Sequence, residues 1–157
     1  MEKGINRTII FIFVLMTHSY QLFSQIITDT IKIGKDKIVF FYPQKSIVSN
    51  TNYEEGFFKD ITCIEDTAFI GLHYGSMVTL PIINCQDKHV ISEYILADDY
   101  RQTRGFYYLN GEKKYFREDN AYKYCFDVYY NNVAEEKLLF YESLLNSLKY
   151  ITEVSHP

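Results

Sequence analysis

The stretch GFYYLNGEKKYFR, residues 105–117, decides how this chain folds. It contains two β-prone, aromatic-rich arms, residues 105–109 and 112–117, on either side of Asn110-Gly111. The Asn-Gly pair readily adopts the positive φ angles of a type I′ turn, which joins two antiparallel strands. The stretch therefore predicts a β-hairpin, and with it an antiparallel sheet to which the rest of the chain contributes.

A further strand is predicted soon after this hairpin, over residues 122–130. Its apolar side chains alternate with mostly polar ones, a period of two that is typical of a half-buried antiparallel strand. The apolar face would consist of Tyr122, Tyr124, Phe126, Val128 and Tyr130.

The last predicted element is a C-terminal helix. Asn132 can cap it, and Glu135, three residues later, completes a capping-box pattern. We expect the apolar stripe of this helix to pack on one face of the sheet. The stripe repeats at helical spacing and consists of Leu138, Tyr141, Leu145, Leu148 and Ile151.

Two strands are predicted near the start of the chain, over residues 26–33 and 37–42. The second is apolar on both faces and is stopped by Pro43, so we expect it to lie centrally in a sheet. The polar residues 44–56 that follow predict a long loop.

The middle of the chain predicts a second hairpin, with arms over residues 57–64 and 68–74. Residues 78–84 are apolar but contain Pro81, which fits an edge strand or an extended connection. Residues 89–96 fit a strand or a short helix, and we expect a strand.

Together these elements predict one α+β domain over residues 25–157. Its antiparallel β-sheet would have about six or seven strands and be packed by the C-terminal α-helix. An apolar N-terminal strand ending at Pro43, a meander of hairpins and a closing helix is similar in element order to Mog1/PsbP-like domains. That similarity carries no functional residue to this chain.

Residues 1–24 have the three parts of a cleavable signal peptide: a basic start, a short apolar centre over residues 9–16, and Ser24 before a polar junction. The apolar centre is too short to span a bilayer, so no transmembrane span is expected after cleavage. The leader resembles those of small exported Bacteroidota proteins, in which Gln directly follows the cleavage site, as Gln25 does here. A periplasmic or secreted location is expected; a buried N-terminal strand or helix is the alternative.

The charge of the chain argues against two classes of partner. Loss of the leader removes two positive charges and one negative, which takes the formal net charge from −4 to −5. Nucleic acids and anionic membranes are bound by clustered Lys and Arg. We expect neither as a partner.

Three cysteines remain after cleavage: Cys63, Cys85 and Cys125. In an oxidising compartment two of them can pair and one is left over, which allows three pairings. A bridge between Cys63 and Cys125 is favoured because both lie in predicted strands.

Candidates for chemistry are few. His73 and His89 lack the chelating spacing of a zinc site, and Cys85 lies only four residues before His89, whereas catalytic Cys and His usually come from distant segments. No catalytic residue, metal site or cofactor is therefore predicted. An exported hydrolase or metal-dependent enzyme that uses His73 or His89 is kept as an alternative.

Aromatic side chains are abundant: 14 Tyr and 9 Phe follow the leader, and there is no Trp. Adjacent pairs such as Tyr107-Tyr108 and Tyr129-Tyr130 must place one ring on each face of a strand, so an exposed tyrosine face is expected. Exposed tyrosines are good protein-contact residues. The predicted partner-binding residues are Tyr107, Tyr108, Tyr115, Tyr129 and Tyr130.

These features favour an exported, non-enzymatic binding protein with a protein partner in the cell envelope. An immunity or inhibitor protein that occludes a basic toxin or enzyme is the specific form expected. A glycan- or lipid-binding envelope module is a further alternative, because aromatic rings also serve as platforms for sugars.

Overall fold

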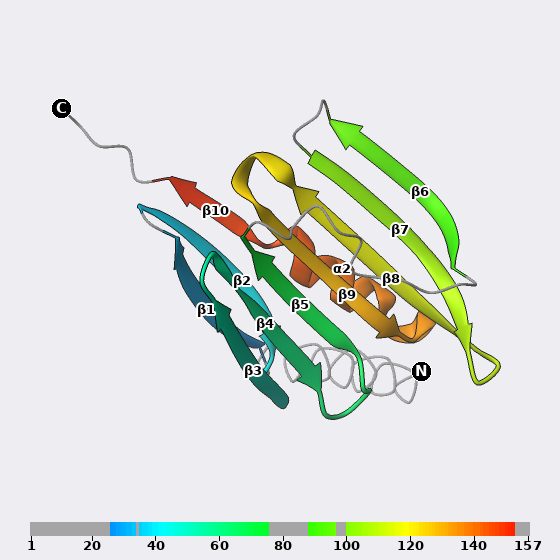
Figure 1. Ribbon diagram of the computed structural model, residues 1–157. Helices are drawn as coiled ribbons and strands as arrows, with labels where there is room; N and C mark the ends of the chain where they lie inside the picture. Colours follow the sequence, from blue (N-terminus) through cyan, green and yellow to red (C-terminus); the bar gives the residue numbers. More distant parts are fainter. Residues whose placement is uncertain (1–25, 34, 76–87, 97–99, 153–157) are drawn as a thin grey trace, which may run out of the picture.

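Two antiparallel β-sheets make up most of the part of the chain that the structure describes (Figure 1). The computed structural model describes residues 26–33, 35–75, 88–96 and 100–152. The smaller sheet has three strands in the order β1-β2-β10. Their bounds are β1 (Ile26–Ile33), β2 (Asp36–Pro43) and β10 (Lys149–Thr152).

The larger sheet has seven strands in the order β3-β4-β5-β9-β8-β7-β6, and all neighbours are antiparallel. Pairing of β5 with β9 joins a three-stranded meander to a four-stranded one, and leaves β3 and β6 as the two edges. The bounds are β3 (Ser46–Tyr53), β4 (Gly56–Cys63), β5 (Phe69–Tyr74), β6 (His89–Leu96), β7 (Tyr100–Leu109), β8 (Glu112–Ala121) and β9 (Phe126–Val133).

The α-helix of the described residues, α2 (Leu138–Asn146), packs against β2 and β9. It follows the short 3₁₀ turn η2 (Glu135–Lys137) and buries Tyr141, Leu144 and Leu145. The fold is thus mostly β with one C-terminal helix, rather than a balanced α+β arrangement. Over the residues that the structure describes, no helix has the length and apolar character needed to cross a membrane.

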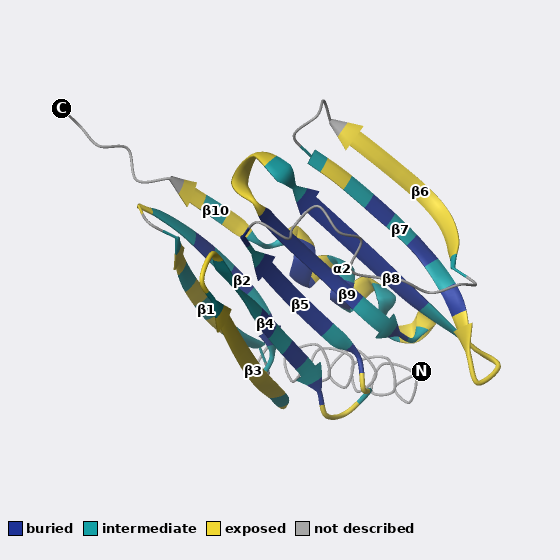
Figure 2. Cartoon of the chain, viewed as in Figure 1, coloured by how far each residue is buried: buried dark blue, intermediate teal, exposed yellow. Residues whose placement is uncertain are grey.

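The main core lies between the inner face of the larger sheet and a layer formed by the smaller sheet and α2. Ile38 of β2, Leu72 of β5 and Tyr141 of α2 are almost completely buried there (Figure 2). The expected central position of residues 37–42 is confirmed, because β2 lies between β1 and β10 in the smaller sheet.

The outer face of the larger sheet is also buried at its centre. Tyr107, Phe116 and Tyr129 form a second apolar cluster there, with Phe69 packed against them. Residues 126–130 of β9 are therefore buried on both faces, where the alternation predicted a half-buried strand.

The predicted hairpin at residues 105–117 is confirmed, and its strands are longer than expected. Leu109 pairs with Glu112, and both turn residues have positive φ angles, 53° at Asn110 and 83° at Gly111. The predicted hairpin of β4 and β5 and the strand over residues 89–96 are also confirmed.

The loop predicted over residues 44–56 is wrong, because Ser46–Tyr53 is β3, paired along its whole length with β4. Its polar composition suits an edge strand that faces solvent. The strand predicted from residue 122 begins only at Phe126, because Tyr122–Tyr124 forms a 3₁₀ turn and Cys125 is left-handed, with φ 49°.

The predicted C-terminal helix is too long at both ends. Asn132 does not cap it but lies in β9 with φ 59°, and its side-chain amide donates to the Thr67 carbonyl at 3.0 Å. Residues 149–152, which the helical spacing included through Ile151, instead form β10 and pair with β2. Pairing with a distant strand overrides the weak helical pattern there.

The favoured Cys63–Cys125 bridge is wrong, because both thiols are free. Cys63 ends β4 beside the turn into β5, and the Cys125 carbonyl accepts from the N–H of Gly75, just past the other end of β5. The length of β5, about 20 Å, separates them, whereas a disulfide needs Cα atoms within about 7 Å. Cys85, the leader over residues 1–24 and the segment 78–84 lie outside the described residues.

Candidate interaction surface

The structure corrects the expected exposed tyrosine face. Of the five tyrosines, only Tyr108 is exposed, at 58%. The others lie on the inner strands β7, β8 and β9 of the larger sheet and are buried there. The buried ones are Tyr107, Tyr115, Tyr129 and Tyr130.

Buried hydroxyl groups among these tyrosines have internal partners. Tyr130 donates to Glu142 of α2 at 2.7 Å, and Tyr107 donates to Asn131 at 2.9 Å. Burial is the main reason why the pKa of Tyr130 is raised above its usual range. In this conformation these rings support the fold.

Exposed apolar side chains concentrate instead on the edge strand β6. Val90, Ile91, Tyr94 and Ile95 are each between 51% and 62% exposed. Because Tyr94 pairs with Gln102 and Ile95 with Arg101, these two side chains lie on opposite faces of the sheet. The edge therefore has apolar side chains on both faces, and Figure 2 shows β6 in the colour of exposed residues.

The opposite edge strand, β3, provides a comparison within the same sheet. Exposed Ile47 and Val48 lie at its start, but the polar residues 49–52 follow, and all four are exposed. Natural sheets commonly protect their edges with polar or charged residues. β3 follows that rule along most of its length, whereas in β6 the polar pair Ser92 and Glu93 is flanked on both sides by exposed apolar residues.

An aromatic cluster lies beside β6 on the face that also carries α2. The His89 ring stacks on Phe106 with centroids 4.8 Å apart, and Tyr108 meets both rings edge-on, at 6.5 Å from His89 and 5.9 Å from Phe106. The Lys113 ammonium lies 4.3 Å from the Phe106 centroid. The sheet register thus brings together two residues singled out in the sequence, His89 and Tyr108.

We name this region the β6 surface. It combines a strand edge with which no other described strand pairs, apolar side chains on both faces, aromatic rings at one end, and the Glu93–Arg101 ion pair. It consists of His89, Val90, Ile91, Tyr94, Ile95, Phe106 and Tyr108. Sequence reasoning missed it because the order of the strands, which puts β6 at an edge, has no local signal in the sequence.

His73, the other histidine candidate, is 2% exposed and belongs to a buried polar network on the outer face. Its Nε2 lies 2.9 Å from the Tyr53 hydroxyl, which donates its only proton to the Tyr74 carbonyl at 2.8 Å. The hydroxyl must then accept from Nε2–H. The Phe58 ring stacks on the imidazole, with centroids 3.9 Å apart.

The other side of this imidazole faces Asp127. Nδ1 of His73 and Oδ2 of Asp127 are 3.9 Å apart, and neither atom has a hydrogen-bond partner among the residues described. Asp127 is fully buried and accepts from the Asn120 amide at 2.5 Å. Burial raises the pKa of Asp127 to about 8 and lowers that of His73. The pair is therefore largely uncharged near neutral pH.

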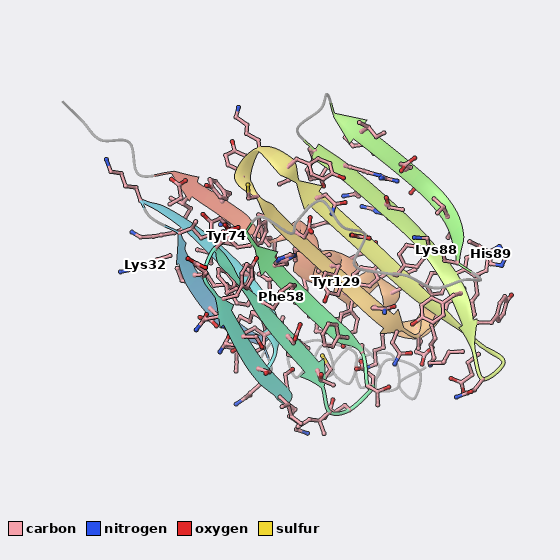
Figure 3. The ribbon with its side chains drawn as sticks, viewed as in Figure 1. Lys32, Phe58, Tyr74, Lys88, His89 and Tyr129 are labelled. Carbon is pink, nitrogen blue, oxygen red and sulfur yellow. The ribbon has the colours of Figure 1, made fainter. Side chains whose placement is uncertain are left out.

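The two histidines do not form a common site. His73 is on β5 and His89 on β6, which are four strand spacings apart, or about 19 Å. Figure 3 shows His89 at the far edge of the sheet from Phe58, the residue that stacks on His73. Among the described residues, no group of three or more His, Cys, Asp or Glu side chains is arranged to hold a metal ion.

Comparison of the chain with known protein families, with curated proteins and with solved structures found no match. The likenesses in leader and element order therefore stay predictions, and the function must be argued from the geometry of the chain itself.

Proposed function

We propose that this protein is an exported, non-enzymatic binding protein whose β6 surface takes up an extended strand of a protein partner. The observation that supports this most is the apolar, unpaired edge of β6, with its four large side chains more than half exposed. The backbone N–H and C=O groups of such an edge can form hydrogen bonds with a strand of another chain.

Addition of a partner strand would use the backbone hydrogen-bonding groups of the β6 edge and its exposed side chains. β6 pairs with β7 on one side, and no other described strand pairs with its outer edge, so the backbone N–H and C=O groups of that edge could form a ladder with a partner strand. Tyr94 on one face and Ile95 on the other would pack against alternate side chains of that strand. Hydrogen bonds supply affinity, and these side chains supply selectivity.

The charge of the chain favours a basic partner. Its formal net charge is −4, and it becomes −5 if the leader is removed as the sequence predicts. Opposite charge accelerates encounter and excludes acidic competitors. Export would place this surface in the periplasm or outside the cell, where an immunity or inhibitor protein would meet its toxin or enzyme.

The enzymatic alternative has less support. A reactant in solvent cannot reach the His73 imidazole, which is 2% exposed, without movement of the surrounding chain. His89 is exposed, but its ring is stacked on Phe106 in the aromatic cluster.

A pair of matched variants tests the proposal. Ile95→Lys alters β6, and Ile47→Lys alters β3 at a residue of the same type with similar exposure. Both variants and the unchanged protein serve as bait in an envelope extract, with quantitative mass spectrometry of what each retains. We expect a protein that the unchanged bait and Ile47→Lys recover equally and that Ile95→Lys recovers at least about tenfold less. The same recovery by all three baits would contradict the proposal.

A further inference from the structure

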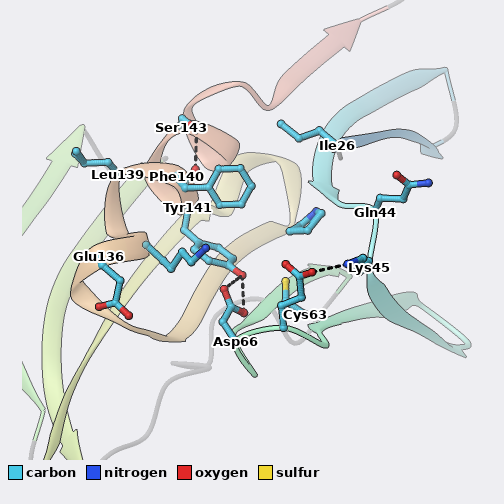
Figure 4. A pocket seen from close by; sticks show the side chains of 13 residues that line it. Ile26, Gln44, Lys45, Cys63, Asp66, Glu136, Leu139, Phe140, Tyr141 and Ser143 are labelled. Carbon is cyan, nitrogen blue, oxygen red and sulfur yellow. Dashed lines mark hydrogen bonds and ion pairs between the residues drawn. The ribbon is translucent and has the colours of Figure 1, made fainter. Parts of the chain in front are cut away.

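A cavity of about 540 Å³ opens beside α2, at the turn between β4 and β5 (Figure 4). This volume is in the range of small-molecule sites. None of its lining residues belongs to the β6 surface. The cavity is lined by Ile26, Pro43, Gln44, Lys45, Cys63, Glu65, Asp66, Glu136, Lys137, Leu139, Phe140, Tyr141 and Ser143.

Two opposed walls of the cavity are apolar. Ile26 and Pro43 come from the start of β1 and the end of β2, whereas Leu139 and Phe140 come from α2. Figure 4 shows the Phe140 ring beside the cavity, with Ile26 approaching from the other side. Walls of this kind would enclose the apolar body of a small ligand.

One carboxylate in the cavity is held in a fixed position. Both oxygens of Asp66 accept from the Tyr141 hydroxyl at 3.0 Å, and Oδ1 also accepts from the Ala68 N–H at 3.1 Å. Tyr141 is itself fully buried, so it anchors this carboxylate rigidly. A preorganised carboxylate loses little freedom when it binds a charged group.

Asp66 has no cationic partner among the described residues. The neighbouring carboxylate, Glu65, forms the ion pair of this turn, with Lys45 at 2.7 Å. The lining of the cavity contains three carboxylates, of Glu65, Asp66 and Glu136, and two lysines, Lys45 and Lys137. The lining therefore favours a ligand with a positive charge over one with a negative charge.

We propose that this cavity binds a small organic ammonium compound, with one amine and an apolar body. The ammonium group would pair with Asp66 and lie near the Phe140 ring, whose face attracts cations. The apolar body would lie between the walls from α2 and the smaller sheet. This site is separate from the β6 surface and does not depend on the function proposed for it.

Three probes of nearly equal shape test the charge preference: 2-phenylethylamine, 2-phenylethanol and 3-phenylpropionate. Titration of the folded protein, followed by calorimetry or by NMR shifts of α2, gives each affinity. We expect the amine to bind at least about tenfold more tightly than the alcohol, and the carboxylate most weakly. Equal affinities, or no binding of the amine at about 10 mM, would overturn the proposal.

Two variants locate the site. Asp66→Asn can still accept from Tyr141 but has no charge, so amine affinity should fall about tenfold toward that of the alcohol. Leu139→Lys changes a side chain that is 85% exposed, so folding is preserved even if Asp66→Asn unfolds. Both ligands lose the same apolar contact with Leu139, and the added positive charge should weaken the amine several-fold more than the alcohol. The control is Glu112→Gln, which removes an exposed carboxylate outside the cavity. If both cavity variants bind the amine as tightly as this control does, the proposed site is rejected.

Discussion

The hydroxyl of Tyr53 and the Nε2 atom of His73 lie 2.9 Å apart, and this contact fixes where the imidazole carries its proton. Because the hydroxyl donates to the Tyr74 carbonyl, Nε2 must be the protonated nitrogen, and Nδ1 presents a lone pair to Asp127. A protonated Asp127 suits this arrangement, since burial raises its pKa to about 8.

The raised pKa of Asp127 predicts how stability depends on pH. Between its usual pKa near 4 and about 8, the unfolded chain loses the proton while the folded chain keeps it. The folded state then binds more protons, so this group lowers the free energy of unfolding as pH rises, by up to about 1.4 kcal/mol per pH unit. The lowered pKa of His73 acts in the opposite sense, and only below pH 6.5 or so.

Asp127→Asn should remove the effect of the carboxylate, because the amide oxygen can still accept from Asn120. Urea denaturation between about pH 6.5 and 7.5 should show a less negative slope of unfolding free energy against pH in the variant, by about 1 kcal/mol per pH unit. An identical slope in both proteins would mean that Asp127 is ionised in the folded state.

At Gly71, in the middle of the larger sheet, the space for a side chain is too small. A Cβ atom there would lie 2.1 Å from Cζ of Tyr129, so the buried ring would have to move. Gly71→Ala should lower the free energy of unfolding by about 1–3 kcal/mol. Gly111→Ala provides the comparison, because it meets no atom within 4 Å and suffers only from its φ of 83°, at a cost of about 1 kcal/mol. Equal losses in chemical denaturation would show that Tyr129 does not press on Gly71.

Arg117 links β8 to α2 and predicts a large effect on stability. Its guanidinium is buried and bonds to Asp119 at 2.6 Å and to Glu142 at 2.7 Å. Arg117→Ala leaves these carboxylates without their main cation and should cost about 3–5 kcal/mol of unfolding free energy. Arg101→Ala, at the exposed pair with Glu93, should cost less than about 1 kcal/mol. If thermal denaturation shows similar losses for both, the buried network does not hold the helix.

Cys63 and Cys125 are expected to differ in reactivity. Cys125 is exposed, whereas Cys63 is buried, and burial raises the pKa of its thiol. In a Cys85→Ser background, a thiol reagent should modify Cys125 in the folded protein and Cys63 only after denaturation. Mass spectrometry that finds neither thiol reactive after denaturation would restore the Cys63–Cys125 bridge.

The elements that the sequence predicts well are those defined by local chemistry. The hairpin at residues 105–117 follows from two residues, Asn110 and Gly111, that accept positive φ angles. β3 was missed because its polar residues form a strand only through pairing with β4. The helical spacing extends to Ile151, because only pairing with β2, more than 100 residues earlier, makes residues 149–152 a strand.

The candidate sites depend on strand order, which the sequence does not reveal. Tyr130 and Tyr108 look alike in an alternating pattern, yet one lies in central β9 and the other near the end of β7. His73 meets Tyr53 and Asp127 only because β3, β5 and β9 lie in one sheet. The exposure of Ile91 and Ile95 follows from the edge position of β6, for which the sequence has no local signal.

Hydrogen exchange of the β6 backbone, with and without the captured partner, tests the proposed function most directly. Strand addition predicts that alternate amides between residues 89 and 96 become at least about tenfold more protected in the complex, while β3 amides at the other edge are unchanged. A complex in which protection appears elsewhere and β6 exchanges as in the free protein would contradict the account.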